Sequence, residues 1–197
     1  LMDRLKVKNQ LKGLLEQYPD RKCKVYLLHG DMEDEEMHSL YAHNQISALV
    51  HLAHGEGFGL PLFESAYSGL PVVATGWSGQ LDFLVDETGK DRFYNVAFDL
   101  NHVPDEVVWE GVLIKESMWA YPREQSAKQK MRQCYEDLSN KVEDSIACGA
   151  CDFANEVQER FNQEKQYSEM VAPILEFIET QEEQEWRGIL DQVVEYE

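Results

Sequence analysis

Glu56 and Glu64 bracket a glycine-spaced turn, with seven residues between them. The surrounding residues, 54–79, read HGEGFGLPLFESAYSGLPVVATGWSG. Pro61 stands where the first residue of a helix is expected, and Gly69 stands where that helix should end. Both carboxylates then lie near a helix N-terminus, where free N–H groups and the helix dipole favour anions.

This turn has the residue types that bind phosphates and hydroxyl groups together. Glycines at 57 and 59 let the backbone approach a ligand closely, so the turn can offer its amides to phosphate or sugar oxygens. A carboxylate repels a phosphate, so Glu56 and Glu64 are expected to accept hydrogen bonds from hydroxyl groups. Phosphates flanked by polyols describe a nucleotide sugar. The turn lacks the lysine of a P-loop and the G-x-G-x-x-G spacing of a dinucleotide fold.

The composition restricts the class of protein. The chain has 197 residues, of which 43% are hydrophobic, and its formal net charge is −19. This length accommodates one domain with a core, or one domain and a helical appendage. The negative charge argues against nucleic acid or an anionic membrane as a partner. No apolar run reaches the ~20 residues of a transmembrane helix, and no signal-peptide pattern is found.

Four cysteines occur, and the last two form a C-x-x-C; they are Cys23, Cys134, Cys148 and Cys151. No second pair has the spacing of metal ligands. We therefore interpret Cys148 and Cys151 as structural thiols on a packed helix, and not as a redox or zinc site, and we expect a reducing, cytoplasmic setting.

Apolar runs alternate with helical stripes over the first hundred residues. Strands are expected over residues 24–28, 46–53, 70–75 and 92–100, with a helix before each of them. This order predicts an α/β fold with a Rossmann-like, mostly parallel sheet flanked by helices. Ligands gather at the carboxyl ends of the strands in such sheets, where residues 29–32 and 54–60 lie.

The second half of the chain is predicted to be mainly helical. A long loop is expected over residues 101–122, followed by helices over 123–140 and 142–161 and a third that Asn162 caps. Pro173 is expected to end or kink this third helix. We expect a nucleotide-sugar-binding domain over residues 1–140 and a C-terminal helical extension over 141–197 that packs on it.

The segment EGFGLPLFE, followed by SGLPVVAT and a glycine-containing loop, resembles the E-x7-E region of retaining glycosyltransferases of family 4. The run DEEMHSLYA resembles the helix that precedes the second strand in that family. The similarity covers about residues 24–85 and is looser over 119–167. Such enzymes have the GT-B architecture, two Rossmann-like domains of which the C-terminal one holds most of the donor. The resemblance therefore implies a partial GT-B C-terminal domain.

The resemblance also implies roles for individual residues. Glu64 would bind the ribose hydroxyls of the donor nucleotide, and Glu56 would contact hydroxyls of the transferred sugar. The sugar and the distal phosphate would meet the backbone amides of Gly57, Phe58, Gly59 and Leu60. The loop at residues 29–32, which includes Gly30, would lie near the base.

Retention in this family is often explained by attack of the acceptor on the donor's own face, with the leaving phosphate helping to take the proton. Glu56, the catalytic candidate, is then a positioning residue before it is a catalyst. The resemblance implies a metal-independent enzyme, so no metal and no cofactor are expected.

His51 and His54 stand at the end of the second strand. A histidine in such a place is typically a packed or hydrogen-bonded structural group. His54 borders the turn and could touch the phosphate or the acceptor, so it is included among the donor-binding candidates. Ser78 could border the donor as well, although a simple helix cap is the usual role of such a serine.

Family members clamp the donor diphosphate with an arginine and a lysine from a strand–helix–strand unit that precedes the region matched here. We therefore expect this chain to be the C-terminal part of a larger retaining transferase acting on a glycan, lipid or protein acceptor. A non-catalytic nucleotide-sugar-binding subunit that completes its cleft with a partner chain is the second possibility. A GT-B-like isomerase or phosphorylase is the third, although the flanks of E-x7-E match transferases better.

Overall fold

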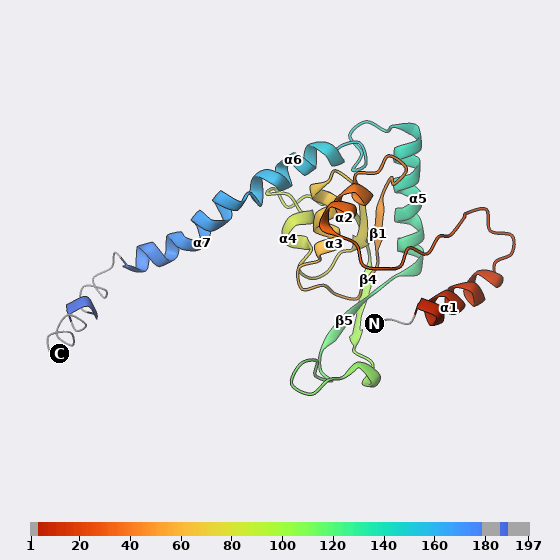
Figure 1. Cartoon of the computed structure of the whole chain (residues 1–197), viewed down its shortest axis with the longest axis horizontal. Coiled ribbons are helices and arrows are strands. Elements are labelled where there is room, and N and C mark those ends of the chain that lie inside the picture. The colour runs from red at the N-terminus through yellow and green to blue at the C-terminus, as the bar shows by residue number, and fades with distance from the viewer. Residues whose placement is uncertain (1–3, 179–185, 189–197) are drawn as a thin grey trace. The chain divides into compact units, whose positions relative to one another are not determined.

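The chain divides into two compact units, and each is described by itself. The structure, a computed structural model, describes residues 4–178 and 186–188 (Figure 1). The first unit comprises residues 1–37 and the second residues 38–197. The predicted fold class is confirmed, because the second unit has a parallel three-stranded sheet flanked by helices. The predicted domain boundary between residues 140 and 141 stays a prediction.

The first unit contains helix α1 (Arg4–Glu16) and leads into α2 (Asp34–Tyr41), whose last residues belong to the second unit. Arg21 folds back on the end of α1, where its Nη1 donates to the carbonyls of Leu15 (3.1 Å) and Tyr18 (3.3 Å). The last carbonyls of a helix have no partner within the helix, so this arginine stabilises the end of α1.

The predicted strand over residues 24–28 is wrong. The segment forms no strand, and the side chains of Tyr26 and Leu28 are 82% and 68% exposed. A strand needs a neighbour whose backbone groups complete its hydrogen-bond ladder. Within the described part of the chain nothing pairs with this segment in a ladder, so its apolar content alone does not make it a strand.

The second unit is built on three parallel strands in the order β1 (Leu49–His51), β2 (Val72–Thr75) and β3 (Tyr94–Val96). The central strand β2 pairs with β1 on one side and with β3 on the other. All four of its residues are buried. A continuous apolar run is typical of a parallel strand that is covered on both faces.

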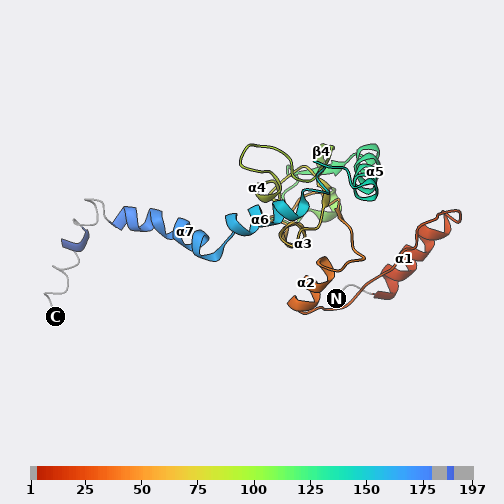
Figure 2. The same cartoon turned by 90° about the horizontal axis from the view of Figure 1, so that it is seen from above.

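Helices cover both faces of this sheet. Helix α3 (Leu60–Tyr67) lies over β1 and β2, and α6 (Ala150–Arg160) packs on α3, as Figure 2 shows. The short helix α4 (Leu81–Leu84) belongs to the same apolar cluster. Helix α5 (Glu124–Asn140) covers β2 and β3 from the other side, so that β1 lies between α3 and α5 in Figure 1.

Side chains of β2 alternate between two clusters, as the period of a strand requires. Val72 and Ala74 pack with α3, α4 and α6, whereas Val73 packs with α5. On the α5 side the buried hydroxyl of Tyr94 donates to Asp137 Oδ2 (2.8 Å) and accepts from the N–H of Ala147 (3.2 Å). Burial raises the pKa of Tyr94, and its hydrogen bond to Asp137 adds to this effect.

The segment after β3 is a hairpin, which corrects the predicted long loop. Strands β4 (Phe98–His102) and β5 (Met118–Pro122) pair in antiparallel fashion. The predicted strand over residues 92–100 divides at Ala97, whose N–H donates to Ser126 Oγ (2.9 Å) and whose carbonyl accepts from Arg123 N–H (2.8 Å). These bonds lead to the start of α5, so the chain leaves the parallel sheet at this residue.

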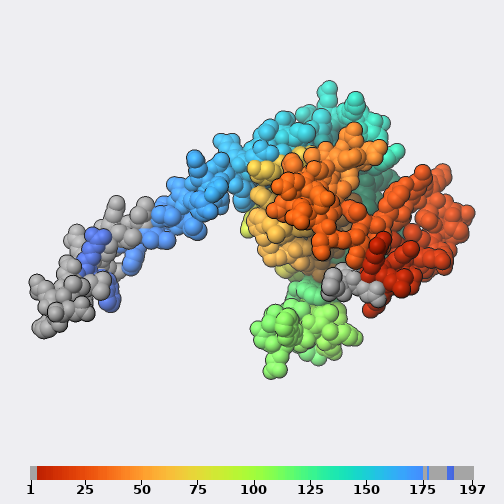
Figure 3. Space-filling view, viewed as in Figure 1, coloured from red at the N-terminus to blue at the C-terminus, as the bar shows by residue number. Residues whose placement is uncertain are grey.

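The connection between β4 and β5 contains a short 3₁₀ helix, Asp105–Val107, and a tight turn in which the N–H of Trp109 donates to the carbonyl of Leu113 (2.9 Å). Trp109, Val112 and Ile114 are exposed there. Figure 3 shows the tip of this hairpin, in green, standing out from the surface of the second unit.

Helix α7 (Gln163–Ile178) begins where the sequence predicts. The cap is confirmed, because Asn162 Oδ1 accepts from the N–H groups of Glu164 (2.9 Å) and Lys165 (3.4 Å). Pro173 does not end this helix, which continues to Ile178. The predicted helix over 142–161 is observed only over α6, because residues 142–149 form turns.

The thiols differ in their environments. Cys134 is buried on α5, and burial raises its pKa to about 11. Cys148 is exposed in a turn, so its predicted place on a packed helix is wrong. Cys151 lies on α6 as predicted, near Gly69, although its side chain is largely exposed. Within residues 4–178 and 186–188, no group of three or more histidine, cysteine, aspartate or glutamate residues could hold a metal ion. No helix in this part of the chain is long and apolar enough to cross a membrane.

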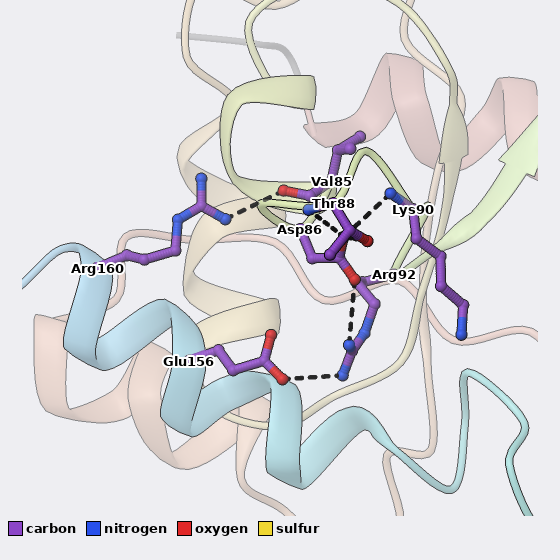
Figure 4. Close-up of polar contacts among 7 residues, drawn as sticks. All are labelled: Val85, Asp86, Thr88, Lys90, Arg92, Glu156 and Arg160. Atoms are coloured by element: carbon purple, nitrogen blue, oxygen red, sulfur yellow. Dashed lines mark hydrogen bonds and ion pairs between the residues drawn. The ribbon is translucent and has the colours of Figure 1, made fainter.

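A polar network ties α6 to the loop before β3 (Figure 4). The guanidinium of Arg92 bridges Asp86 (3.4 Å) and Glu156 (3.3 Å). Arg160 donates through Nη1 to the carbonyl of Val85 (3.0 Å) and through Nη2 to that of Asp82 (2.6 Å). A polar cavity of about 510 Å³ lies between these elements. This cavity lies at the amino end of β3. Arg92 and Arg160, which line it, already bond to carboxylates and carbonyls of the protein.

Asp86 organises the loop itself. Its Oδ1 accepts from the hydroxyl of Thr88 (2.6 Å), from the N–H of Thr88 (2.9 Å) and from the N–H of Lys90 (3.0 Å). The hydrogen bond from the Thr88 hydroxyl is the main reason that the pKa of Asp86 falls to about 2.

We predict that Asp86 makes the protein sensitive to acid. An unfolded aspartate has a pKa of about 3.9, so between about pH 4 and pH 2 the unfolded chain takes up a proton that the folded chain does not. This contribution to stability is complete above that range and is lost as the pH falls through about 2. Urea unfolding should therefore show wild-type stability approaching that of Asp86→Asn as the pH falls. Glu87→Gln is the matched control, and parallel pH profiles of wild type and Asp86→Asn would contradict the prediction.

Candidate functional site

The turn between β1 and α3 places the predicted site residues at the carboxyl end of the sheet. Gly59 adopts a φ of 90°, a left-handed conformation that favours glycine, and its carbonyl accepts from the N–H groups of Leu62 and Phe63 (both 3.0 Å). Pro61 lies in the first turn of α3, where its missing N–H costs nothing. The local sequence therefore starts the helix at Leu60.

A second loop, residues 76–80 after β2, holds this turn in place. The carbonyl of Glu56 accepts from Ser78 Oγ (2.6 Å) and from Gly79 N–H (3.4 Å). A Cβ atom at Gly79 would lie 1.9 Å from the carbonyl oxygen of Gly57, so the two backbones touch directly. The side chain of Ser78 thus bonds to the turn, which corrects its interpretation as a helix cap.

The N–H groups of the turn are unpaired within the described residues, and of these residues Gly59 is buried. Within the described residues, no hydrogen-bond partner is found for the N–H groups of Gly57, Phe58, Gly59 and Leu60. The first N–H groups of a helix lack partners inside the helix, and the helix dipole gives them a partial positive charge. A Cβ atom at Gly57 would meet no atom within 4 Å, so the space beside it is open. A turn at the N-terminus of a helix can bind an anion.

Glu56 pairs with the last residue of β1. Nε2 of His51 lies 3.2 Å from Oε1 of Glu56, and the two side chains are 23% and 29% exposed. His51, which the sequence suggests is a structural group, therefore contacts the candidate catalytic residue. The sequence signal for this contact is the position of His51 at the end of a strand, five residues before Glu56.

Glu64 contacts a tyrosine that the sequence analysis missed. Tyr41, the last residue of α2, is buried. Burial raises the pKa of Tyr41 to about 12, and the charge of Glu64 and a hydrogen bond to it add to this effect. The tyrosine hydroxyl therefore keeps its proton beside the carboxylate of Glu64. Each of the two carboxylates thus has a polar neighbour from a preceding element, His51 for Glu56 and Tyr41 for Glu64.

His54 connects the turn to the hairpin. Its carbonyl accepts from the N–H of Ala120 (3.0 Å), and its Nδ1 lies 3.0 Å from the carbonyl of Ala120. Its ring stacks on Trp119 at 5.4 Å and lies 4.4 Å from the ring of Tyr121. These contacts give His54 a structural role. Its predicted contact with a phosphate or an acceptor stays a prediction and would have to use Nε2.

The remaining predicted donor-binding residues, Phe58, Leu60 and Gly30, lie in three different environments. Phe58 packs on Phe63 and Phe83, with ring centroids 5.3 and 5.0 Å away, which fixes the turn to the core below it. Leu60 is exposed. Gly30 belongs to the first unit, so its predicted position near the base stays a prediction.

Comparison with known families gives one match. Residues 6–93 match the family model described as glycosyl transferases, group 1. This range is less than half of the chain and includes β1, the turn, both carboxylates and α3. No curated protein and no solved structure matches the chain. The match supports a glycosyltransferase domain in this part of the chain.

We predict that Gly79 and Gly57 respond differently to the same substitution. Gly79→Ala should cost about 1–3 kcal/mol of stability, because its methyl group would push against the backbone of the turn. Gly57→Ala should change stability by less than about 0.5 kcal/mol, since its methyl group enters open space. Chemical denaturation of both variants checks this, and equal losses would show that the two loops do not touch as described.

Proposed function

We propose that the strand–turn–helix formed by β1, residues 52–59 and α3 binds the nucleotide-sugar donor of a retaining glycosyltransferase. The main support is the set of N–H groups at residues 57–60, which have no partner within the described residues and lie between two carboxylates. Such a turn suits a ligand that carries phosphates between two polyols. The family match over residues 6–93 supports the same class of enzyme.

Each half of the donor then has its own partner. Glu64 accepts hydrogen bonds from the ribose hydroxyls, and Glu56 accepts them from hydroxyls of the transferred sugar. The N–H groups of the turn bind the distal phosphate and the sugar, with the dipole of α3 directed at the negative charge. The open space beside Gly57 lets the ligand approach the backbone closely.

The reaction that fits this arrangement is sugar transfer with retention. The acceptor hydroxyl oxygen forms a bond to the anomeric carbon on the face from which the nucleoside diphosphate leaves, and the bond from that carbon to the phosphate oxygen breaks. The acceptor proton passes to the leaving phosphate. In this scheme the protein needs no nucleophile, and Glu56 positions the sugar for attack.

The charge of the diphosphate needs cations that the turn does not supply. No lysine or arginine occurs between residues 25 and 89, and the formal net charge of the chain is −19. We propose that a second domain or a partner subunit contributes the cations, and with them the acceptor site for a glycan, a lipid or a protein. The same observation favours a second candidate, a non-catalytic subunit that binds the nucleotide sugar and completes its cleft with a partner.

We predict that Glu64→Ala weakens nucleotide-sugar binding by about tenfold or more, because hydrogen bonds to a charged group contribute about 1.5–3 kcal/mol. Isothermal titration of the full chain with UDP-glucose and GDP-mannose measures this. Glu136→Ala, which removes an exposed carboxylate from α5, is the matched control and should bind as the wild type does. Unchanged binding by Glu64→Ala would reject the ribose assignment, and a wild type that binds no nucleotide sugar would reject the proposed donor site.

We also predict that the 197-residue chain alone transfers no sugar, since its turn holds no cation for the leaving diphosphate. Incubation with a radiolabelled nucleotide sugar and a mixture of glycan, lipid and peptide acceptors checks this. Transfer by the chain alone would contradict the need for a second domain or subunit. Transfer that appears only when that part is added would support the transferase over the non-catalytic subunit.

A further inference from the structure

We propose that His51 is a positioning residue for the sugar half of the donor, and that it acts by holding the carboxylate of Glu56. The inference rests on the proposed function. It assigns a role to a residue that sequence reasoning interprets as structural. It starts from the contact of 3.2 Å between His51 Nε2 and Glu56 Oε1.

The two partners differ in how firmly the fold holds them. His51 lies in β1, in register with Ala74 of the buried central strand, so its backbone is fixed by the parallel ladder. Its side chain points to the same face as Leu49, which packs on the cluster below α3. Glu56 lies in a turn flanked by glycines, where a long side chain has much conformational freedom to lose. The strand therefore fixes the histidine, and the histidine fixes the glutamate.

The contact leaves the carboxylate able to bind a ligand. The contact from His51 Nε2 occupies one position on Oε1, and a carboxylate can accept about four hydrogen bonds. Within residues 4–178 and 186–188, His51 is the only polar partner that the structure gives the Glu56 side chain. The backbone carbonyl of Glu56 is bonded separately, to Ser78 and Gly79. The remaining lone pairs of the carboxylate are free to receive sugar hydroxyls.

The neighbouring carboxylate provides an internal comparison. Tyr41 contacts Glu64, the residue proposed for the ribose, whereas His51 contacts Glu56, the residue proposed for the sugar. Loss of His51 should therefore affect only ligands that carry the sugar. If the histidine merely packed in β1, its loss would change the affinities for all of these ligands alike, or for none of them.

The test compares a nucleoside diphosphate with its sugar ester on the full chain. Affinities for UDP and UDP-glucose, and for GDP and GDP-mannose, are measured by titration, and each pair gives a ratio that reports the contribution of the sugar. His51→Leu should lower this ratio by at least about fivefold while the affinity for UDP or GDP stays within about twofold. His51→Gln, which keeps an N–H donor, should restore most of the ratio.

Two further variants test whether the histidine acts through Glu56. Glu56→Ala should lower the ratio as His51→Leu does, and the double variant should lower it no further, because the two residues form one unit. Tyr41→Phe should weaken the binding of the nucleoside diphosphate and of its sugar ester equally, so that the ratio stays the same. Val50→Ala, next to His51 on the other face of β1, is the control for disturbance of the strand and should change neither affinity.

The outcomes separate the two proposals. A wild type that binds neither UDP-glucose nor GDP-mannose overturns the proposed function and this inference with it. A wild type that binds, together with an unchanged ratio in folded His51→Leu, overturns the role of His51 alone. If His51→Leu does not fold, His51→Asn, whose amide is too short to reach Glu56, takes its place. If His51→Gln lowers the ratio as much as His51→Leu does, the inference is also overturned.

Discussion

The direct backbone contact between Gly57 and Gly79 is the constraint on which the candidate site depends. It brings the loops that follow β1 and β2 together with no side chain between them, because a Cβ atom at Gly79 would lie 1.9 Å from the carbonyl oxygen of Gly57. The carbonyl of Glu56 accepts two further hydrogen bonds from the same loop. The carbonyls of Glu56 and Gly57 meet this loop, whereas the N–H groups of residues 57–60 have no partner within the described residues. The strand order places this contact at the carboxyl end of the sheet, where parallel sheets bind their ligands.

Charge is distributed unevenly between the two ends of the sheet. At the amino end of β3, Arg92 and Arg160 are bonded to carboxylates and backbone carbonyls, and they dock α6. At the carboxyl end the turn presents N–H groups and a helix dipole, with no lysine or arginine between residues 25 and 89. Dipoles of this kind are worth less than about 2 kcal/mol each. A diphosphate in so acidic a chain therefore needs cations from elsewhere, which is the physical argument for a composite site.

Sequence reasoning predicts the elements whose signals are local. The apolar run of β2, the helical stripe of α5 and the glycine-spaced turn are all observed at about the predicted positions. Signals that depend on distant partners are missed. Residues 24–28 have the composition of a strand but no neighbour in a ladder among the described residues, and the hairpin of β4 and β5 depends on a register that joins Phe98 to Pro122. The polar neighbour of Glu64, Tyr41, comes from a helix that sequence spacing alone does not bring to the turn.

The hairpin extends the site beyond the part of the chain that matches a known family. Residues 6–93 match, yet the first residue of the turn, His54, is bonded through its carbonyl and its ring to Ala120 of β5. The turn is thus held on three sides, by β5 at its start, by α3 at its end and by the loop after β2 across its carbonyl groups. A turn fixed in this way loses little conformational freedom when a ligand binds, so more of each hydrogen bond is available as affinity. Such preorganisation would let a turn without cations contribute specificity to the proposed donor site.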